Sequence, residues 1–255
     1  MSDSTMGSFG NFIGSIGSAV GFVDGSCPEH GAFNVLVRKG REWHCPRCLE
    51  LMMAKESHEL WLTERNKSLM DSATIPKKYI GQRFQAVTPE QKIVRGTVRT
   101  FRDFILGEPT WAALIMIGKT GTGKTLLACE FAQSLISSAS KSVRYLTAKG
   151  MISEIQSSYG REGKSEEGEL MRFAQYDVLI LDEVDAIPAR ENSSLLLTEV
   201  VNRRYNDNKP VIVISNQPFD NLSKFVGDRV HSRLHENSFA CDFDWSDFRR
   251  VGVQA

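Results

Sequence analysis

The stretch that decides the fold is Gly118-Lys119-Thr120-Gly121-Thr122-Gly123-Lys124-Thr125, which fits the phosphate-binding pattern G-x-x-x-x-G-K-[ST]. The apolar run 111–117 precedes it and indicates a buried strand, and residues 126–136 follow with the apolar spacing of a helix. A strand, a glycine-rich loop and a helix in this order are typical of a nucleoside-triphosphate site. A chance glycine-rich turn is the alternative, and the two flanking elements argue against it.

Each residue type in this loop has a physical purpose. Glycine lets the backbone wrap closely, so that successive N–H groups point at phosphate oxygens. Lys124 is expected to place its ammonium on the β and γ phosphates, and the Thr125 hydroxyl is expected to bind Mg²⁺. The predicted nucleotide contacts are Gly118, Gly121, Thr122, Gly123, Lys124, Thr125 and Leu126.

A second motif is the apolar strand 178–181, which ends in Asp182 and Glu183. The carboxyl end of a buried parallel strand faces the ligand, so Asp182 is predicted to hold Mg²⁺ beside the P-loop. Glu183 is predicted to polarise the water that attacks the γ phosphate. The pair favours hydrolysis over transfer to a small acceptor. A strand that ends in acidic residues by chance is the alternative.

Strands and helices alternate from Tyr79 onward. This alternation predicts an α/β fold with a mostly parallel, five-stranded sheet between helices. The expected strands are 114–117, 143–147, 178–181, 211–215 and 239–242, and the expected helices are 125–137, 149–158, 166–174, 193–206 and 222–234.

Composition sets outer limits on the function. The 255 residues include 31 Lys and Arg and 31 Asp and Glu, so the net charge is zero and no overall basic field demands nucleic acid. No apolar run is long enough to cross a bilayer, and residues 1–25 lack the features of a signal peptide. Five cysteines, an odd number, favour a reducing cytoplasm over a disulfide scaffold.

The region before the ATPase core carries two zinc-type knuckles, Cys27-Pro28-Glu29-His30 and Cys45-Pro46-Arg47-Cys48. Four such ligands predict a structural zinc ion bound by Cys27, His30, Cys45 and Cys48, with His44 as a competing ligand. Residues 33–37 and 42–44 are expected to pair across a turn at 39–40, which gives a small zinc ribbon. Cys129 and Cys241 read as buried free thiols. Unrelated cysteines near a histidine are the alternative.

Two segments flank this ribbon. Residues 1–26 are rich in Gly and Ser and predict a flexible tail, although their apolar residues suit a short element that orders on a partner. Residues 49–71 predict an exposed helix with one apolar stripe, which could dock on the ATPase, a sister subunit or another protein. We place the boundaries at 1–26 (tail), 27–71 (ribbon plus helix) and 72–255 (ATPase).

Polar residues continue the nucleotide argument near the end of the chain. The strand 211–215 ends in Ser215-Asn216-Gln217, whose side chains are expected to reach the γ phosphate or the attacking water. Further on, Arg229 and Arg233 are four residues apart and share a helix face. They form either a solvated basic face or an arginine finger that reaches the ATP of a neighbouring subunit.

Taken together, these motifs resemble the DnaC-type replicative helicase loaders, which are AAA+ ATPases, over residues 72–250. The resemblance rests on the lead-in Ile75-Pro76…Tyr79…Phe84, the P-loop, Leu181-Asp182-Glu183, Ser215-Asn216, Val226-Gly227-Asp228-Arg229-Val230-x-x-Arg233-Leu234 and Phe243-Asp244-Trp245-Ser246-Asp247-Phe248-Arg249. It implies that Asn216 acts as sensor I and that Arg229 and Arg233 act as sensor and finger, with Arg233 favoured as the finger. It also implies that the helical lid of many AAA+ proteins is absent.

The resemblance implies a partner set as well. Such a protein binds a DnaB-type hexameric helicase, assembles side by side in a spiral, and places the helicase on single-stranded DNA under control of its ATP state. Candidate DNA contacts are Lys149, Arg161, Lys164, Arg172 and the loop after Glu183.

The zinc ligands depart from the DnaC pattern and resemble the DnaI-type loaders, as in phage-encoded versions. The ribbon is expected to dock on the helicase or, through Arg38, Lys39, Arg41 and Arg47, on DNA. Two other functions stay open: an IstB-like transposition helper and an ATP-binding DNA adaptor with little turnover.

Overall fold

The computed structural model describes residues 20–38, 44–107, 110–159, 163, 165–187 and 191–247. Its contacts divide the chain into two compact units, Met1–Glu64 and Arg65–Ala255, and each is described by itself. No helix of the described residues is long and apolar enough to cross a membrane.

The first unit contains an antiparallel hairpin of β1 (Val20–Cys27) and β2 (Gly31–Arg38). The turn between them lies at 28–30, and Gly31 follows with a φ of 75°, a conformation that favours glycine. The predicted strand 33–37 is therefore right, and its partner among the described residues is β1. Residues 42 and 43 of the predicted partner strand lie outside the described residues. Residues 20–26 belong to this hairpin, which corrects the prediction that the tail extends to residue 26. Residues 1–19 lie outside the described part of the chain.

Helix α1 (Pro46–Ser72) follows the hairpin, as the sequence predicted, and starts with proline at a position that needs no N–H donor. None of its residues is buried. Leu51 and Leu60 are 62% and 67% exposed. The helix is exposed as predicted, but its apolar side chains do not form a single stripe, because Leu49 and Leu51 lie about 200° apart around the helix.

The second unit is built on a five-stranded sheet in the order β4-β5-β6-β3-β7, and all of its pairs are parallel. The fold prediction is confirmed. The strands are β3 (Ala113–Gly118), β4 (Val143–Thr147), β5 (Val178–Asp182), β6 (Val211–Ser215) and β7 (Ser238–Phe243). Parallel register brings the carboxyl ends of β3, β5 and β6 to one edge, where the sequence places its nucleotide motifs.

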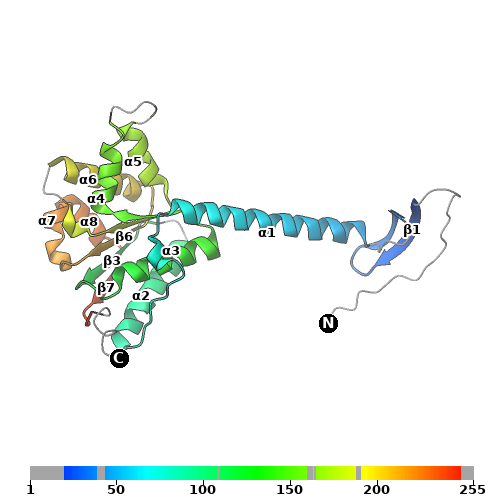
Figure 1. Ribbon diagram of the computed structural model, residues 1–255, viewed down its shortest axis with the longest axis horizontal. Coiled ribbons are helices and arrows are strands. Elements are labelled where there is room, and N and C mark those ends of the chain that lie inside the picture. Colours follow the sequence, from blue (N-terminus) through cyan, green and yellow to red (C-terminus); the bar gives the residue numbers. More distant parts are fainter. Residues whose placement is uncertain are drawn as a thin grey trace. The chain divides into compact units, whose positions relative to one another are not determined.

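Helices cover both faces of this sheet (Figure 1). On one face α2 (Pro89–Leu106) and α3 (Lys124–Ala139) pack over a core that includes Phe101 and Phe131. On the other face lie α4 (Ala148–Gln156), α5 (Glu166–Gln175), α6 (Glu191–Asn206), α7 (Ser223–Val226) and α8 (Asp228–His235). Short 3-10 turns, η1 (Lys77–Tyr79), η2 (Val184–Ala186) and η3 (Phe219–Asn221), connect these elements.

Two helices differ from expectation. The sequence reading gave no helix over 89–106, where α2 lies, although Thr88 and Gln91 form a capping box with Pro89 in the first turn. The expected helix 222–234 is interrupted at Gly227, whose φ of 82° no helix interior allows, so it becomes α7 and α8.

Candidate nucleotide-binding site

The P-loop joins β3 to α3, and its glycines have the backbone conformation that the motif requires. Gly118, Gly121 and Gly123 have φ values of 135°, 82° and 94°, and side-chain-bearing residues rarely adopt these. Gly123 caps the amino end of α3, so the first free N–H groups of that helix face the loop. A cavity of about 340 Å³ opens here, lined by Gly121, Lys124 and other residues of the loop and of the strand ends.

Lys124 is folded back onto the loop. Its Nζ donates to the carbonyl oxygens of Gly118 (2.6 Å) and Lys119 (2.7 Å) and to Oδ1 of Asn216 (3.0 Å). Burial lowers the pKa of Lys124, and the negative charges of Asp182 and Asp185 oppose that shift. Phosphate oxygens would replace the carbonyl acceptors without a large movement of the side chain.

Asp182 is buried at the end of β5 and collects hydrogen bonds from three elements. Its Oδ2 accepts from Thr125 Oγ1 and from the hydroxyl of Tyr145, each at 2.8 Å, and its Oδ1 accepts from the backbone N–H of Glu183 at 2.8 Å. A hydroxyl and a carboxylate side by side are hard oxygen donors of the kind that Mg²⁺ prefers, so Thr125 and Asp182 fit the ion that the sequence predicts. Such an ion would supply positive charge that neutralises the phosphates.

Glu183 directly follows Asp182 and adopts a left-handed backbone conformation with a φ of 52°. This conformation is uncommon for a residue with a side chain and is found often at functional sites. The side chain of Glu183 is exposed and lines the cavity. It is therefore available to polarise a water molecule, which is the role that the sequence assigns to it.

Asp185 is a site residue that sequence reasoning missed. Its carboxylate accepts from Ser215 Oγ (3.1 Å), from the Asn216 backbone N–H (3.2 Å) and from Asn216 Nδ2 (3.4 Å). Because Asn216 also contacts Lys124, Asp185 orients the residue that the sequence reading placed near the γ phosphate. The third acidic residue in Asp182-Glu183-Val184-Asp185 was a usable signal.

The segment after β7 forms an outer wall of the P-loop. The Trp245 indole donates to the carbonyl oxygen of Thr122 at 3.0 Å. A methyl group on Gly118 would lie 2.5 Å from the Phe243 carbonyl oxygen, and one on Gly121 would collide with the Asp247 carboxylate. The loop is thus enclosed by protein on the side away from the cavity.

Of the two predicted finger arginines, Arg233 lies far from the P-loop of its own chain. The Trp111 indole, next to the amino end of β3, donates to the Arg233 carbonyl oxygen at 3.0 Å, whereas the P-loop follows the carboxyl end of that strand, about 20 Å away. The Arg233 guanidinium stacks 4.5 Å from the centre of the Tyr205 ring and donates to Asn202. Arg229, one turn earlier, is exposed.

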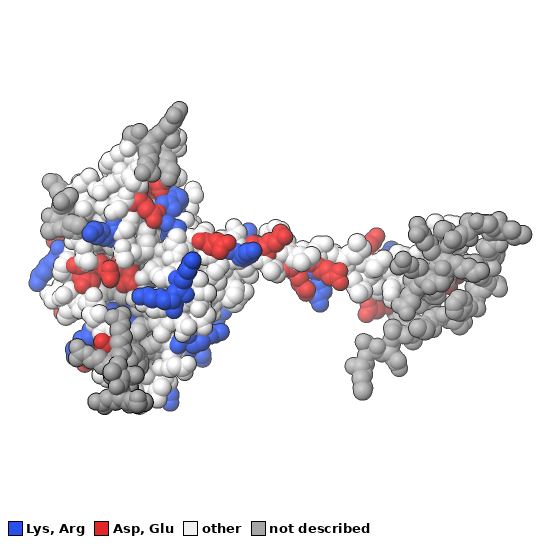
Figure 2. Space-filling model, in the orientation of Figure 1, with Lys and Arg blue, Asp and Glu red and all other residues white. Residues whose placement is uncertain are grey.

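The candidate DNA contacts differ in whether their side chains are exposed or already paired with acidic residues. Lys149 is exposed at the start of α4. Arg172 lies on α5, which matches the predicted helix 166–174, and it pairs with Glu154 (2.8 Å) and Glu169 (2.6 Å). Arg161 and Lys164 lie outside the described residues. On the face shown in Figure 2, basic and acidic side chains are interspersed over the ATPase unit.

The first unit brings together the four predicted zinc ligands. Their donor atoms all lie within 4.8 Å of one another, with Sγ of Cys48 3.3 Å from Nδ1 of His30. Separations near 3.5 Å are what a tetrahedral Cys₃His site needs, so the residues fit zinc. The backbone N–H of Glu29 lowers the pKa of Cys27 to about 7, which favours the thiolate that binds metal. His44 is exposed and lies outside the cluster.

The two remaining cysteines, Cys129 and Cys241, are buried and free, as predicted. Burial raises the pKa of each to about 12, so both thiols are inert.

Comparisons with known proteins show which proteins this chain is similar to. The replicative helicase loader DnaC of Escherichia coli K12 is 29% identical over 139 residues, which is 54% of this chain and 56% of the relative. A putative ATP-binding protein of insertion sequence IS5376 from Geobacillus stearothermophilus is 32% identical over 117 residues, 46% of this chain and 45% of the relative. The chain thus spans about half the length of the curated relatives it matches.

A crystal structure of the DnaC helicase loader covers 66% of this chain and 99% of its own, with a TM-score of 0.58 and 20% identity, which shows a shared fold. These likenesses support the resemblance to DnaC-type AAA+ loaders. The model of the family described as IstB-like ATP binding protein matches residues 32–234. Because that match spans well over half of the chain, the chain belongs to the IstB-like ATP-binding protein family.

Proposed function

We propose that this chain is an ATP-switched loader that places a DnaB-type hexameric helicase on single-stranded DNA. The observation that carries the proposal is the convergence of Lys124, Thr125, Asp182, Glu183 and Asn216 on one cavity in a chain that shares 29% identity with a DnaC loader. A loader needs a site whose protein contacts change with the state of the phosphates. The Lys124–Asn216 and Thr125–Asp182 hydrogen bonds are made by side chains that phosphate and Mg²⁺ would also engage.

ATP hydrolysis is the proposed timing step. Lys124 and the P-loop N–H groups hold the phosphates, Thr125 and Asp182 hold Mg²⁺, and Glu183 orients the attacking water. Asn216 links the γ-phosphate end of the cavity to Lys124 on one side and to Asp185 on the other.

Self-association into a spiral is the proposed working state. Arg233 lies near the amino end of β3, too far to complete the site of its own chain. An arginine there is suited to reach the ATP of a neighbouring subunit, as arginine fingers do.

The first unit is the proposed docking module for the helicase. Structural zinc at Cys27, His30, Cys45 and Cys48 would hold the hairpin onto the start of α1. The exposed apolar side chains of α1, including Met52, Met53 and Trp61, give a partner protein apolar surface to cover.

The test is a loading assay with the full chain and the replicative helicase of its host. Helicase and loader are first co-purified, and helicase bound to naked single-stranded DNA circles is then measured with and without loader and ATP. We expect a stable complex and loading that requires ATP. If no DnaB-type helicase co-purifies and no loading occurs, the proposal is wrong.

Two other functions are outcomes of the same test. The family match and the insertion-sequence relative favour an IstB-like transposition helper, which would instead bind a transposase and duplex DNA. A DNA adaptor with little turnover would bind ATP and DNA but show no hydrolysis stimulated by DNA.

A further inference from the structure

Tyr145 of β4 lies between the nucleotide cavity and the segment that ends α1. Its side chain is buried, with 8% exposed. The hydroxyl donates to Asp182 Oδ2 at 2.8 Å, on the same oxygen that accepts from Thr125.

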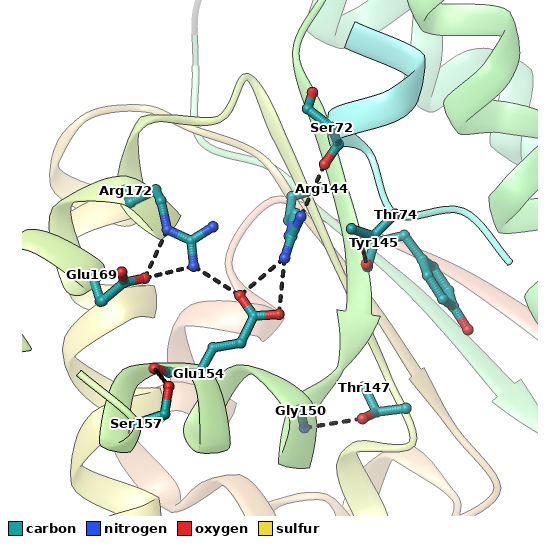
Figure 3. A network of polar contacts seen from close by, with 10 residues as sticks. All are labelled: Ser72, Thr74, Arg144, Tyr145, Thr147, Gly150, Glu154, Ser157, Glu169 and Arg172. Carbon is teal, nitrogen blue, oxygen red and sulfur yellow. Dashed lines mark hydrogen bonds and ion pairs between the residues drawn. The ribbon is translucent and has the colours of Figure 1, made fainter. Parts of the chain in front are cut away.

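The backbone of Tyr145 is hydrogen-bonded to the segment at the end of α1. Tyr145 N–H donates to the Ala73 carbonyl oxygen at 2.9 Å, and Thr74 Oγ1 donates to the Tyr145 carbonyl oxygen. The neighbouring Arg144 donates to the Ser72 carbonyl oxygen at 2.9 Å (Figure 3). Residues 72–74 therefore lie along β4, an edge strand of the sheet, and we call them the strap.

The strap is itself anchored. Ala73 is fully buried, and Arg144 is held by Glu154 at 2.8 Å, which also pairs with Arg172. The chain continues from the strap directly into Pro76 and Tyr79, which line the nucleotide cavity. Tyr145 thus contacts two groups. Its hydroxyl bonds to the Asp182 oxygen that also accepts from Thr125, and its backbone bonds to the residues that lead into the cavity wall.

We propose that Tyr145 is a positioning residue that orients Asp182 for Mg²⁺ and couples nucleotide binding to the hold of the strap on β4. The inference rests on the proposed ATP site. When Thr125 turns its hydroxyl oxygen to the ion, Tyr145 remains the side chain that fixes the Asp182 carboxylate. Any shift of β4 at Tyr145 moves both the phenol and the strap, and coupling of this kind is reciprocal. Because Ser72 of the strap is the last residue of α1, a change in the hold of the strap on β4 would act on this end of the helix.

The test compares Tyr145→Phe, Thr74→Ala and wild type in the full chain. Tyr145→Phe removes only the hydroxyl, and Thr74→Ala removes the bond to the Tyr145 carbonyl oxygen at a residue that does not line the cavity. The measurement is binding of a fluorescent, non-hydrolysable ATP analogue as Mg²⁺ is titrated. Outer partners of metal ligands contribute roughly tenfold to hundredfold in metal affinity, so we expect the half-saturating Mg²⁺ concentration of Tyr145→Phe to rise by about tenfold.

Thr74→Ala is expected to raise the same concentration, and Thr74→Ser, which keeps the hydroxyl, to restore it. Tyr159→Phe is the matched control, because Tyr159 is exposed and bonds to Glu166 instead. Binding of the analogue in EDTA should be equal in all variants. A second readout is hydrogen exchange of the Tyr145 amide, which Mg²⁺ and the analogue should slow in wild type and not in Tyr145→Phe.

The outcomes separate the two proposals. If wild type binds the analogue in a Mg²⁺-dependent way and Tyr145→Phe does the same at the same Mg²⁺ concentration, the positioning role is wrong. If Tyr145→Phe needs more Mg²⁺ but Thr74→Ala binds the analogue at the wild-type Mg²⁺ concentration, the proposed coupling to the strap is wrong. If wild type does not bind the analogue, the proposed function fails together with the inference.

Discussion

Replacing Asp185 by alanine removes a carboxylate that no sequence motif had marked. Asp185 lies on η2 and accepts three hydrogen bonds from two consecutive residues, Ser215 and Asn216, at 3.1, 3.2 and 3.4 Å. The Asn216 amide then contacts Lys124 on its other side at 3.0 Å. In Asp185→Ala the amide would lose the group that fixes its rotation, while Lys124 and the P-loop would stay intact.

The structure sets the size of the effect. A buried hydrogen bond to a charged group contributes about 1.5–3 kcal/mol, and the exposure of Asn216 and the 3.4 Å contact place this case at the lower end. If about 1.4 kcal/mol of transition-state stabilisation depends on the orientation of Asn216, kcat falls by about tenfold. The free energy of unfolding should fall by about 1–2 kcal/mol, because the Ser215 hydroxyl, which is buried, loses an acceptor.

The assay is steady-state ATP hydrolysis together with equilibrium binding of a fluorescent ATP analogue. We expect kcat to fall by about tenfold while the dissociation constant changes by less than about threefold. Asp220→Ala, which removes an exposed carboxylate on η3, is the control and should match wild type. Unchanged hydrolysis in a folded Asp185→Ala protein, or a loss of binding as large as the loss of hydrolysis, would refute the reasoning.

Three other variants test the remaining parts. Lys124→Ala should abolish ATP binding and helicase loading, as measured by analogue fluorescence and by the loading assay; retained binding would contradict the site. Arg233→Ala should spare ATP binding and lose cooperative hydrolysis, whereas normal cooperativity would remove Arg233 as the finger and leave Arg229→Ala as the variant to measure. Metal analysis should find about one zinc per chain. Cys45→Ser should lose the zinc and unfold the first unit by circular dichroism, and a metal-free wild type would overturn that assignment.

Much of the ATPase fold could be predicted because its signals are local. A strand that is buried on both faces of the sheet, such as 178–181, is recognised in the sequence as a continuous apolar run. The P-loop motif in turn predicts the connection between β3 and α3. The three nucleotide motifs end neighbouring parallel strands, so that the register of the sheet brings them together.

Some of the errors concern contacts between segments far apart in sequence, and others concern local signals that were not recognised. Tyr145 and Asp185 matter through neighbours on β5 and β6, and neither belongs to a motif. The hairpin was misread because its turn contains Pro28 and His30, so that the metal knuckle itself is the turn and the first strand precedes it. Helix α2 was missed although its capping box is a local signal.

The segment after β7 packs against the P-loop and limits which residues can replace two of its glycines. At Gly118 and Gly121 any added side chain would strike Phe243 or Asp247 before a nucleotide is present. At Gly118 the obstructing atoms are backbone, so packing alone forbids substitution. At Gly121 the Asp247 carboxylate could turn aside, and the φ of 82° disfavours a side chain there. A descendant of this chain that had lost ATP binding but kept its fold would still carry both glycines. Substitutions would be found first at Lys124 or Glu183.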